Sequence, residues 1–235
     1  MAYSGRNMTN VAAKHLGLIE FIKFLKLQDW MWNKRVLGEI GDIILFAEHP
    51  PVISLGSRRR EEQNRHILVA PEFLRTRGIP VIQTERGGSV TIHCPGILGC
   101  YIIADISGLE FSTEFIYRLE YWVQKSLEML GIDTKRLPPE FRKVETAKYE
   151  GLWIGCKKIA SVGIKISRHI TRFGININIS PKEYMLRMVN PCGIEEYEFS
   201  SLAQEGFMIN TRDVISGLEN NMDILFRNIK KNLAQ

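Results

Sequence analysis

A cysteine stands between a proline and a glycine in the stretch Asn190-Pro191-Cys192-Gly193-Ile194. Proline has no amide hydrogen, and glycine lets the backbone adopt unusual angles and approach another group closely. A cysteine that only fills a core needs neither neighbour. We therefore interpret Cys192 as a presented nucleophile, and a nucleophilic cysteine needs a nearby cation or base that favours its thiolate.

Three basic side chains on or beside expected strands are candidates for that group: His93, Lys157 and Lys158. Lys158 opens the stretch KIASVGIKI, in which small residues such as Ser161 let a ligand approach the backbone. Most hairpin lysines are solvated, however, and most single cysteines are buried apolar residues. Residue types alone do not separate a Cys192–Lys158 catalytic pair from two structural residues.

Length and composition fit a soluble globular protein that forms one domain over residues 1–235, with a core over roughly residues 16–232. The chain has 235 residues, of which 45% are hydrophobic and 24% charged, and this is ordinary for a globular domain. The first ten residues are polar, so we expect no signal peptide. No run approaches the about 18 apolar residues of a membrane span. We expect a cytoplasmic protein with no membrane association.

The cysteines and histidines give no support to a metal site. Without secretion, the four cysteines are expected to be free thiols rather than disulfides. The sequence contains no Cys-x-x-Cys pair, and its five histidines are scattered. We expect no bound metal.

The densest positive charge is the run Arg58-Arg59-Arg60, in a chain with a net charge of +5. A short charge run is usually a solvated loop, and the alternative is a docking site for an acidic partner. Aromatic residues do not interleave with the run as they do on single-strand binding platforms. We favour an acidic protein partner over nucleic acid.

Hydrophobic periodicity predicts an α+β domain, with a mixed, mostly antiparallel sheet flanked by helices. Apolar stripes predict helices over residues 16–38 and 112–131 and from residue 211, the first with Gln28 as a polar intruder. Short strands are expected on both sides of the double proline 50–51. Another strand turns at Gly87-Gly88 and continues, and the apolar stretch LGCYIIADI follows.

Residues 151–180 alternate and are rich in isoleucine, which predicts a meander of two or three strands. Ser180-Pro181-Lys182-Glu183 combines a capping box with a proline at the first helical position, so a short helix is expected there. Asn190 precedes a proline and should end that helix. Cys192 is therefore expected in the loop that follows.

Five motifs occur in the order found in the octanoyltransferases of lipoate biosynthesis. They are EHPPVISLG (residues 48–56), RGGSVTIHCPG (86–96), KIASVGIKI (158–166), NPCGI (190–194) and SSL (200–202). The stretch LGLIEFIKFLKLQ also resembles the opening helix of that family. The resemblance covers roughly residues 16–203, and the motifs are specific in combination.

This resemblance implies the fold shared by the catalytic domains of biotin and lipoate protein ligases. It implies transfer of an octanoyl group from acyl carrier protein to a lysine of a lipoyl domain, in 2-oxoacid dehydrogenases or the glycine cleavage H protein. The cysteine matching Cys192 forms an acyl-thioester, and the lysine matching Lys158 activates it. Because the thioester is already activated, no nucleotide or other cofactor is required. We also expect the protein to be a monomer.

The resemblance also assigns residues to the acyl pocket. In this family the pocket is lined by the segments that match Arg86, Gly87, Gly88, Ser89, Val90, Thr91, Ile92 and His93, then Ser161, Val162 and Gly163, and finally Gly174, Ile175 and Asn176. Without the resemblance, the two glycines would be read as an ordinary hairpin turn and His93 as a core histidine bonded to backbone.

The chain departs from the family pattern at several positions. It has Cys94 and Ile97 where the family usually has glycine and glutamine, and Phe173 and Asn176 where the family has histidine and alanine. These changes remove polar groups near the acyl carbonyl or narrow its pocket, and they leave the Cys192–Lys158 pair in place. We therefore expect the same reaction, with a change in the length of the acyl chain, in the donor or in the rate. Cys94 is a rival nucleophile, but adjacent strand residues point to opposite faces, so it should not meet His93.

Two alternatives to the transferase stay open. The first is a ligase that activates free lipoate or octanoate with ATP; the absence of a glycine-rich phosphate loop argues against it. The second is a non-catalytic relative that binds acylated carriers or lipoyl domains, which the departures from the family pattern motivate.

Overall fold

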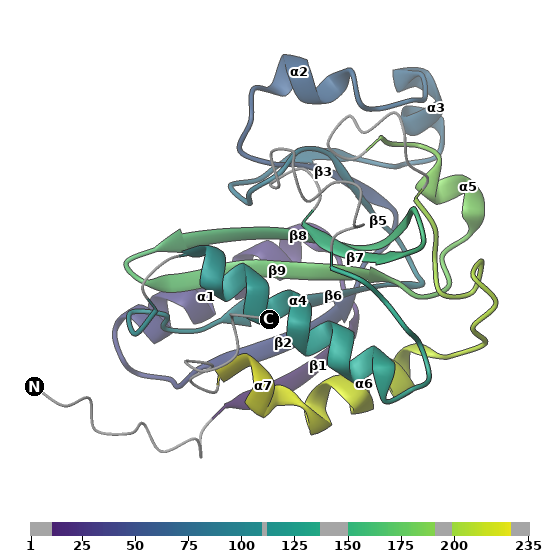
Figure 1. The fold of residues 1–235 in the computed structure, drawn as a ribbon. Helices are drawn as coiled ribbons and strands as arrows, with labels where there is room; N and C mark the ends of the chain where they lie inside the picture. The colour runs from purple at the N-terminus through teal and green to yellow at the C-terminus, as the bar shows by residue number, and fades with distance from the viewer. Residues whose placement is uncertain (1–10, 110–111, 137–149, 191–198, 227–235) are drawn as a thin grey trace, which may run out of the picture.

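Six strands form the larger sheet of the computed structural model, which describes residues 11–109, 112–136, 150–190 and 199–226 (Figure 1). The order across the sheet is β1 (Ala12–Leu18), β2 (Ile43–Glu48), β6 (Ile97–Ile103), β9 (Ile170–Asn178), β8 (Lys157–Ser167) and β7 (Gly151–Ile154). β1 and β2 run parallel, and the other neighbouring pairs are antiparallel. The predicted mixed, mostly antiparallel sheet is confirmed.

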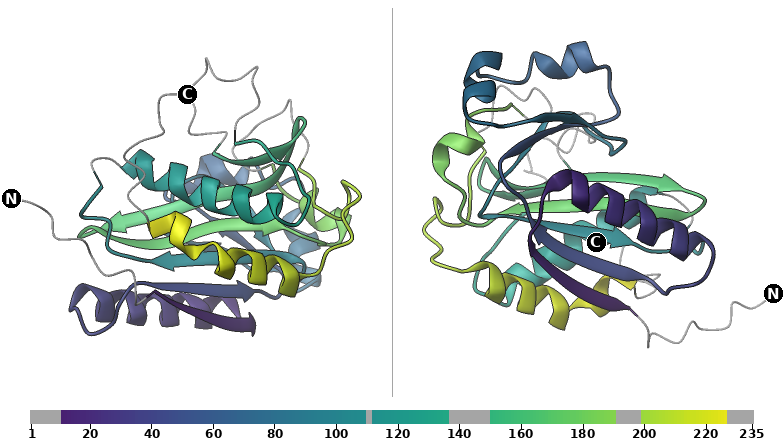
Figure 2. Two further views of the ribbon diagram at one scale, coloured as in Figure 1. Left: turned by 60° about the horizontal axis from the view of Figure 1, so that its bottom comes forward. Right: turned by 180° about the vertical axis from the view of Figure 1, so that it is seen from behind.

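Helices cover both faces of this sheet, because its central strands alternate two apolar sets. Ile43 and Leu45 pack with helix α1 (Phe21–Val36). Ile44 and Phe46 point the other way and share a core with α4 (Ser112–Glu128) and α6 (Thr211–Asn220). Figure 2 shows α1 on one face and α4, α6 and α7 (Met222–Phe226) on the opposite face. The side-chain period of two thus explains the three layers.

A smaller sheet lies beside the large one and has the order β4 (Val81–Gln83), β3 (Val52–Leu55), β5 (Thr91–His93). β3 is parallel to β4 and antiparallel to β5. Its apolar residues form a separate cluster with side chains of α3 (Pro71–Thr76) and α5 (Glu183–Leu186). The short helix α2 (Arg60–Asn64) precedes α3. The predicted strand through Gly87-Gly88 is therefore two strands that flank β3 and do not pair with each other.

The first predicted helix was wrong at its start. Residues 12–18 form β1, and the helix begins only at Phe21. Leu18 and Ile22, which the predicted stripe included, are exposed by 61% and 55%. The buried face instead consists of Phe21, Phe24, Gln28 and Met31. Gln28 is a buried polar residue on that face, as predicted, and its Oε1 accepts a hydrogen bond from the Phe173 amide at 2.9 Å.

Two other helix predictions need correction. α5 begins at Glu183 with Lys182 as its N-cap residue, and no side chain caps it, so the predicted capping box at Ser180 does not form. The amide of Ser180 instead donates to the Gly96 carbonyl at 3.0 Å. The helix predicted from residue 211 does begin there, capped by Asn210, but it is interrupted at Asn221 before α7.

Gly174 provides a test of the contact between the central strands β6 and β9. A Cβ at this position would lie 2.1 Å from the Cys100 carbonyl oxygen, whereas a Cβ at Gly108 would meet nothing within 4 Å. We expect Gly174→Ala to lower the free energy of unfolding by about 1–3 kcal/mol, because the strands must separate. Urea denaturation measures the loss, with Gly108→Ala as the control. Equal stabilities of the two variants would contradict this packing.

Candidate active site

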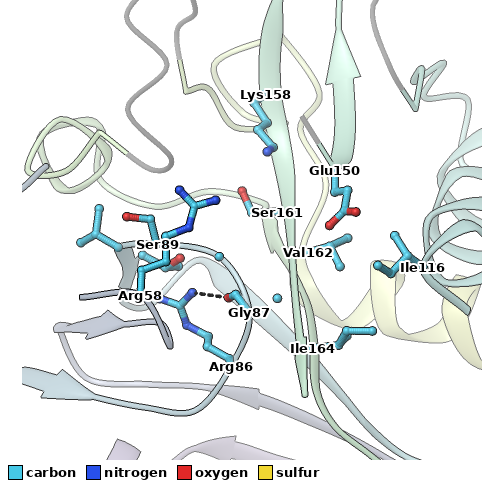
Figure 3. A pocket seen from close by; sticks show the side chains of 14 residues that line it. Arg58, Arg86, Gly87, Ser89, Ile116, Glu150, Lys158, Ser161, Val162 and Ile164 are labelled. Atoms are coloured by element: carbon cyan, nitrogen blue, oxygen red, sulfur yellow. Dashed lines mark hydrogen bonds between the residues drawn. The ribbon is translucent and has the colours of Figure 1, made fainter. Parts of the chain in front are cut away.

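The largest predicted group of site residues meets at one pocket, where the smaller sheet abuts the edge of β8. The pocket has a volume of about 170 Å³ and is lined by residues 86–91 from the loop before β5, by Lys158 and residues 161–164 from β8, and by Arg58, Ile116 and Glu150 (Figure 3). Ten of the predicted residues are thus brought together, although they lie in two groups about 70 positions apart in the sequence.

Glycines allow two backbones to touch at this pocket. The Gly87 amide donates to the Ile164 carbonyl at 2.9 Å. A Cβ on Gly163 would lie 3.1 Å from the Gly87 oxygen, and a Cβ on Gly56 would lie 2.2 Å from the Gly88 oxygen. A side chain at Gly163 would hold the loop away from β8, and one at Gly56 would displace the loop at Gly88. These contacts join two backbones, and the predicted close approach of an acyl chain to Gly87, Gly88 and Gly163 stays a prediction.

A β-bulge directs Lys158 into the pocket. Trp153 pairs with Lys158 and Leu152 pairs with Ala160, so Ile159 is an extra residue in β8. Without the bulge, Lys158 and Ser161 would point to opposite faces of the sheet, because side chains alternate along a strand. With it, both side chains line the same pocket.

Lys158 and its neighbour have different environments, as the alternation of the strand predicted. Lys158 is 2% exposed, and its Nζ lies 5.3 Å from the centre of the Trp153 ring. Lys157 points outward, and its Nζ lies 3.1 Å from Glu205 Oε1. Gly151 makes room for the buried lysine, because a Cβ there would lie 2.8 Å from Lys158 Cε.

Cys192 falls in segment 191–198, outside the described residues, but both ends of that segment are described. Before it, the Asn190 amide donates to the His66 carbonyl at 2.8 Å. After it, Phe199 forms a parallel bridge with Lys158, and the Ser200 amide donates to the Lys158 carbonyl at 3.0 Å. The chain that leaves this segment therefore runs beside the buried lysine.

Two carboxylates lie near Lys158, and sequence reasoning missed both. Glu120 on α4 is buried; its Oε1 accepts from the Gly151 amide at 2.6 Å and its Oε2 from Arg136 Nε at 2.8 Å. Burial raises the pKa of Glu120, while Arg136 opposes the rise. Burial, and then the charge of Glu120, raises the pKa of Glu150 to about 7, while Lys158 opposes this. The pocket thus contains an acid that titrates near neutrality.

His93 does not line the pocket but holds a residue that does. Arg86 donates to Ser54 Oγ from Nε at 3.1 Å and from Nη2 at 2.9 Å. These two bonds use the lone pairs of the Ser54 hydroxyl, so Ser54 donates its single proton to His93 Nε2, 2.8 Å away. The neutral ring therefore carries its own proton on Nδ1. Burial, followed by His49 and Arg86, keeps the pKa of His93 well below its usual value. His93 is therefore a neutral acceptor that fixes Ser54 and, through it, Arg86.

The other predicted pocket residues lie behind the lining. Gly174 and Asn176 on β9 pair with Gly163 and Ser161, so they sit one strand farther from the opening. Ile175 belongs to the core of the large sheet, and Ile92 to the cluster of the small one. Their role in substrate binding stays a prediction.

The departures from the family pattern also lie away from the lining. Cys94 and Ile97 are buried in the apolar cluster of the small sheet, and Phe173 packs under α1. The expectation that these residues narrow the pocket therefore finds no support in the lining. Burial, and then Glu48, raises the pKa of Cys94 to about 12, which disfavours the thiolate of this rival nucleophile.

The part of the chain that the structure describes contains neither a cluster of potential metal ligands nor a helix suited to cross a membrane. Within it, no three or more His, Cys, Asp or Glu side chains are grouped as ligands of a metal ion. None of its helices combines the length and apolar character that crossing a bilayer requires.

Comparisons with known proteins show the family and the fold of the chain. The lipoyl protein ligase A/B catalytic domain family matches residues 23–223. The chain is 32% identical over 208 residues to an octanoyltransferase of Caldicellulosiruptor bescii, covering 87% of this chain and 86% of that protein. It is 34% identical over 203 residues to an octanoyltransferase of Chloroflexus aggregans, covering 84% and 86%. The crystal structure of lipoate-protein ligase A bound with ATP superposes with a TM-score of 0.70 at 13% identity, covering 92% of this chain and 85% of that chain, and shows the same fold.

Ser54→Ala tests the support of the pocket loop. The change removes the hydroxyl that joins Arg86 to His93, so buried donors and an acceptor lose a partner. We expect the free energy of unfolding to fall by about 1–3 kcal/mol. Urea denaturation measures it beside Ser107→Ala, an exposed serine. A loss no larger than that of Ser107→Ala would refute the supporting role of Ser54.

Proposed function

Because this chain belongs to the lipoyl protein ligase A/B catalytic domain family, we propose that it transfers an octanoyl group from acyl carrier protein to a lysine of a lipoyl domain through a Cys192 thioester. The observation that carries the proposal is the position of Lys158. Its buried side chain lines the pocket, and its backbone pairs with Phe199, the residue that directly follows segment 191–198. The octanoyltransferase relatives support the acyl group.

In the first half-reaction, the carrier thioester is exchanged for an enzyme thioester. The amine of Lys158 accepts the Cys192 proton, and the thiolate attacks the octanoyl carbonyl. The carbon–sulfur bond to the carrier breaks, and the carrier thiolate takes up the proton. The Val162 amide faces the same strand edge as the Ile164 carbonyl, because backbone groups alternate along a strand. It is therefore our candidate donor to the oxyanion.

In the second half-reaction, the acceptor lysine attacks the enzyme thioester. Its amine forms the amide bond, and the bond to Cys192 sulfur breaks. The thioester supplies the driving force, so the proposed reaction needs no nucleotide. The acceptors we propose are lipoyl domains of 2-oxoacid dehydrogenases or the H protein, in the cytoplasm and with the enzyme as a monomer.

Arg58 supports an acidic donor protein. It is exposed, lines the pocket and is followed by Arg59 and Arg60, which are also exposed. A positive surface at the pocket opening attracts an acidic carrier protein and steers its approach.

The ATP-dependent ligase remains the second candidate because lipoate-protein ligase A has the same fold. Requirement for ATP separates the two reactions: a ligase modifies a lipoyl domain only with ATP and free acid, whereas the proposed transferase works with octanoyl-acyl carrier protein alone. A non-catalytic binding protein would form no covalent adduct with either donor.

The acyl-enzyme is tested by intact-protein mass spectrometry after mixing with octanoyl-acyl carrier protein in the absence of ATP. We expect one octanoyl adduct, mapped by peptide digestion to Cys192 and absent from Cys192→Ser. Lys158→Ala should slow adduct formation by about 100-fold or more, the usual contribution of a positioned base.

Lys158→Arg is the matched control, because it keeps the positive charge but does not act as a base near neutral pH. It should be slow like Lys158→Ala if the lysine transfers protons, and faster if charge alone matters. A wild-type protein without any adduct would refute the proposed transferase.

A further inference from the structure

Glu150 places a carboxylate in the pocket that also contains Lys158. It immediately precedes β7 and lines the pocket together with Ile116 of α4. In Figure 3, Glu150 and Ile116 lie on one side of the β8 strand, whereas Arg58 and Ser89 lie on the other. Glu150 and Lys158 both line this one pocket, so the acid and the lysine open onto the same cavity.

The charged groups around Glu150 come from three elements. Glu120 faces it from α4, Lys158 from β8, and Arg136, which follows α4, pairs with Glu120. Arg58 lines the far side of the pocket. Both oxygens of Glu120 are already bonded, to Arg136 and to the Gly151 amide. No described residue makes a hydrogen bond to Glu150, so its carboxyl remains available to exchange a proton.

The electrostatic surroundings of Glu150 shift the pKa of its carboxyl toward neutral pH. Burial and the nearby charge of Glu120 raise the pKa of Glu150 to about 7, and Lys158 acts in the opposite direction. A carboxyl with its ordinary pKa is a weak base at neutral pH, whereas a group that titrates near the working pH both accepts and releases protons readily.

The proposed reaction releases a net proton in only one of its halves. Exchange of one thioester for another consumes and returns a single thiol proton. Transfer to a lysine differs, because the acceptor begins as an ammonium ion and ends as a neutral amide. Two protons leave its nitrogen: one returns to the Cys192 thiolate, and the other needs a different acceptor.

We propose that Glu150 accepts this proton, which reaches it from the acceptor ammonium ion through Lys158. Before the attack, the neutral amine of Lys158 takes one proton from the acceptor ammonium ion and passes it to the carboxylate of Glu150, which gives it to solvent. The neutral acceptor amine then attacks, and as the carbon–nitrogen bond forms and the bond to Cys192 sulfur breaks, the remaining proton goes to the Cys192 thiolate. This inference rests on the proposed octanoyl transfer and adds a proton-accepting residue specific to the second half-reaction.

The test measures the two half-reactions separately in Glu150→Gln, with Glu128→Gln, an exposed glutamate, as the control. Formation of the octanoyl-enzyme from octanoyl-acyl carrier protein should change less than about threefold. Transfer from the isolated octanoyl-enzyme to a purified lipoyl domain should slow by about 100-fold, within the range for loss of a proton-transfer group. Glu128→Gln should match the wild type in both.

Two further readouts distinguish proton transfer from structural damage. Hydroxylamine is neutral near pH 7 and needs no deprotonation before it attacks, so it should cleave wild-type and Glu150→Gln octanoyl-enzymes at similar rates. The transfer rate of the wild type should rise with pH around pH 7 as Glu150 ionises, and Glu150→Gln should lose that rise.

Equal slowing of both half-reactions in Glu150→Gln, or transfer at the wild-type rate, would overturn the inference while leaving the acyl-enzyme intact. A wild-type protein that forms no octanoyl-enzyme would instead remove the proposed function and this inference with it.

Discussion

The hydrogen bond from the Gly87 amide to the Ile164 carbonyl is the contact on which the pocket depends. It brings the loop of the small sheet against the β8 edge that β7 leaves uncovered, since β7 pairs with β8 only as far as Ser161. The approach requires Gly163 to lack a side chain. Arg86 then stabilises the loop through Ser54, so a buried polar network maintains the shape of the pocket. The lining of the pocket and its support follow from this one contact, and the bulge at Ile159 adds the lysine.

Most elements of the fold follow from periodicity, and the errors have local causes. The apolar runs on both sides of the double proline and the isoleucine-rich meander predicted their strands correctly, because each of these strands buries apolar side chains. β1 was missed because its residues are mostly exposed and its pairing with β2 is a tertiary contact. The capping box at Ser180 failed because the Gly96 carbonyl takes its amide. A local pattern does not reveal such a competitor.

The sequence likewise predicted one part of the pocket, and the tertiary structure determined the other part. The resemblance to the octanoyltransferase family assigned the segments around Gly87 and Ser161 to one pocket, and both segments line the pocket of the structure. Tertiary structure places the other residues of the pocket. A one-residue bulge at Ile159 turns Lys158 toward Ser161, and Glu150, which immediately precedes β7, lines the same pocket. Burial raises the pKa of the Cys94 thiol and leaves this rival a poor nucleophile.

The central claim is that the acyl group on Cys192 occupies the pocket between the Gly87 loop and the edge of β8. The most direct measurement is a crystal structure of the octanoyl-enzyme. The account predicts density for the chain between residues 86–91 and 161–164, with Lys158 Nζ within hydrogen-bonding distance of the thioester. An octanoyl chain elsewhere, for example in the apolar cluster around Cys94, would contradict it.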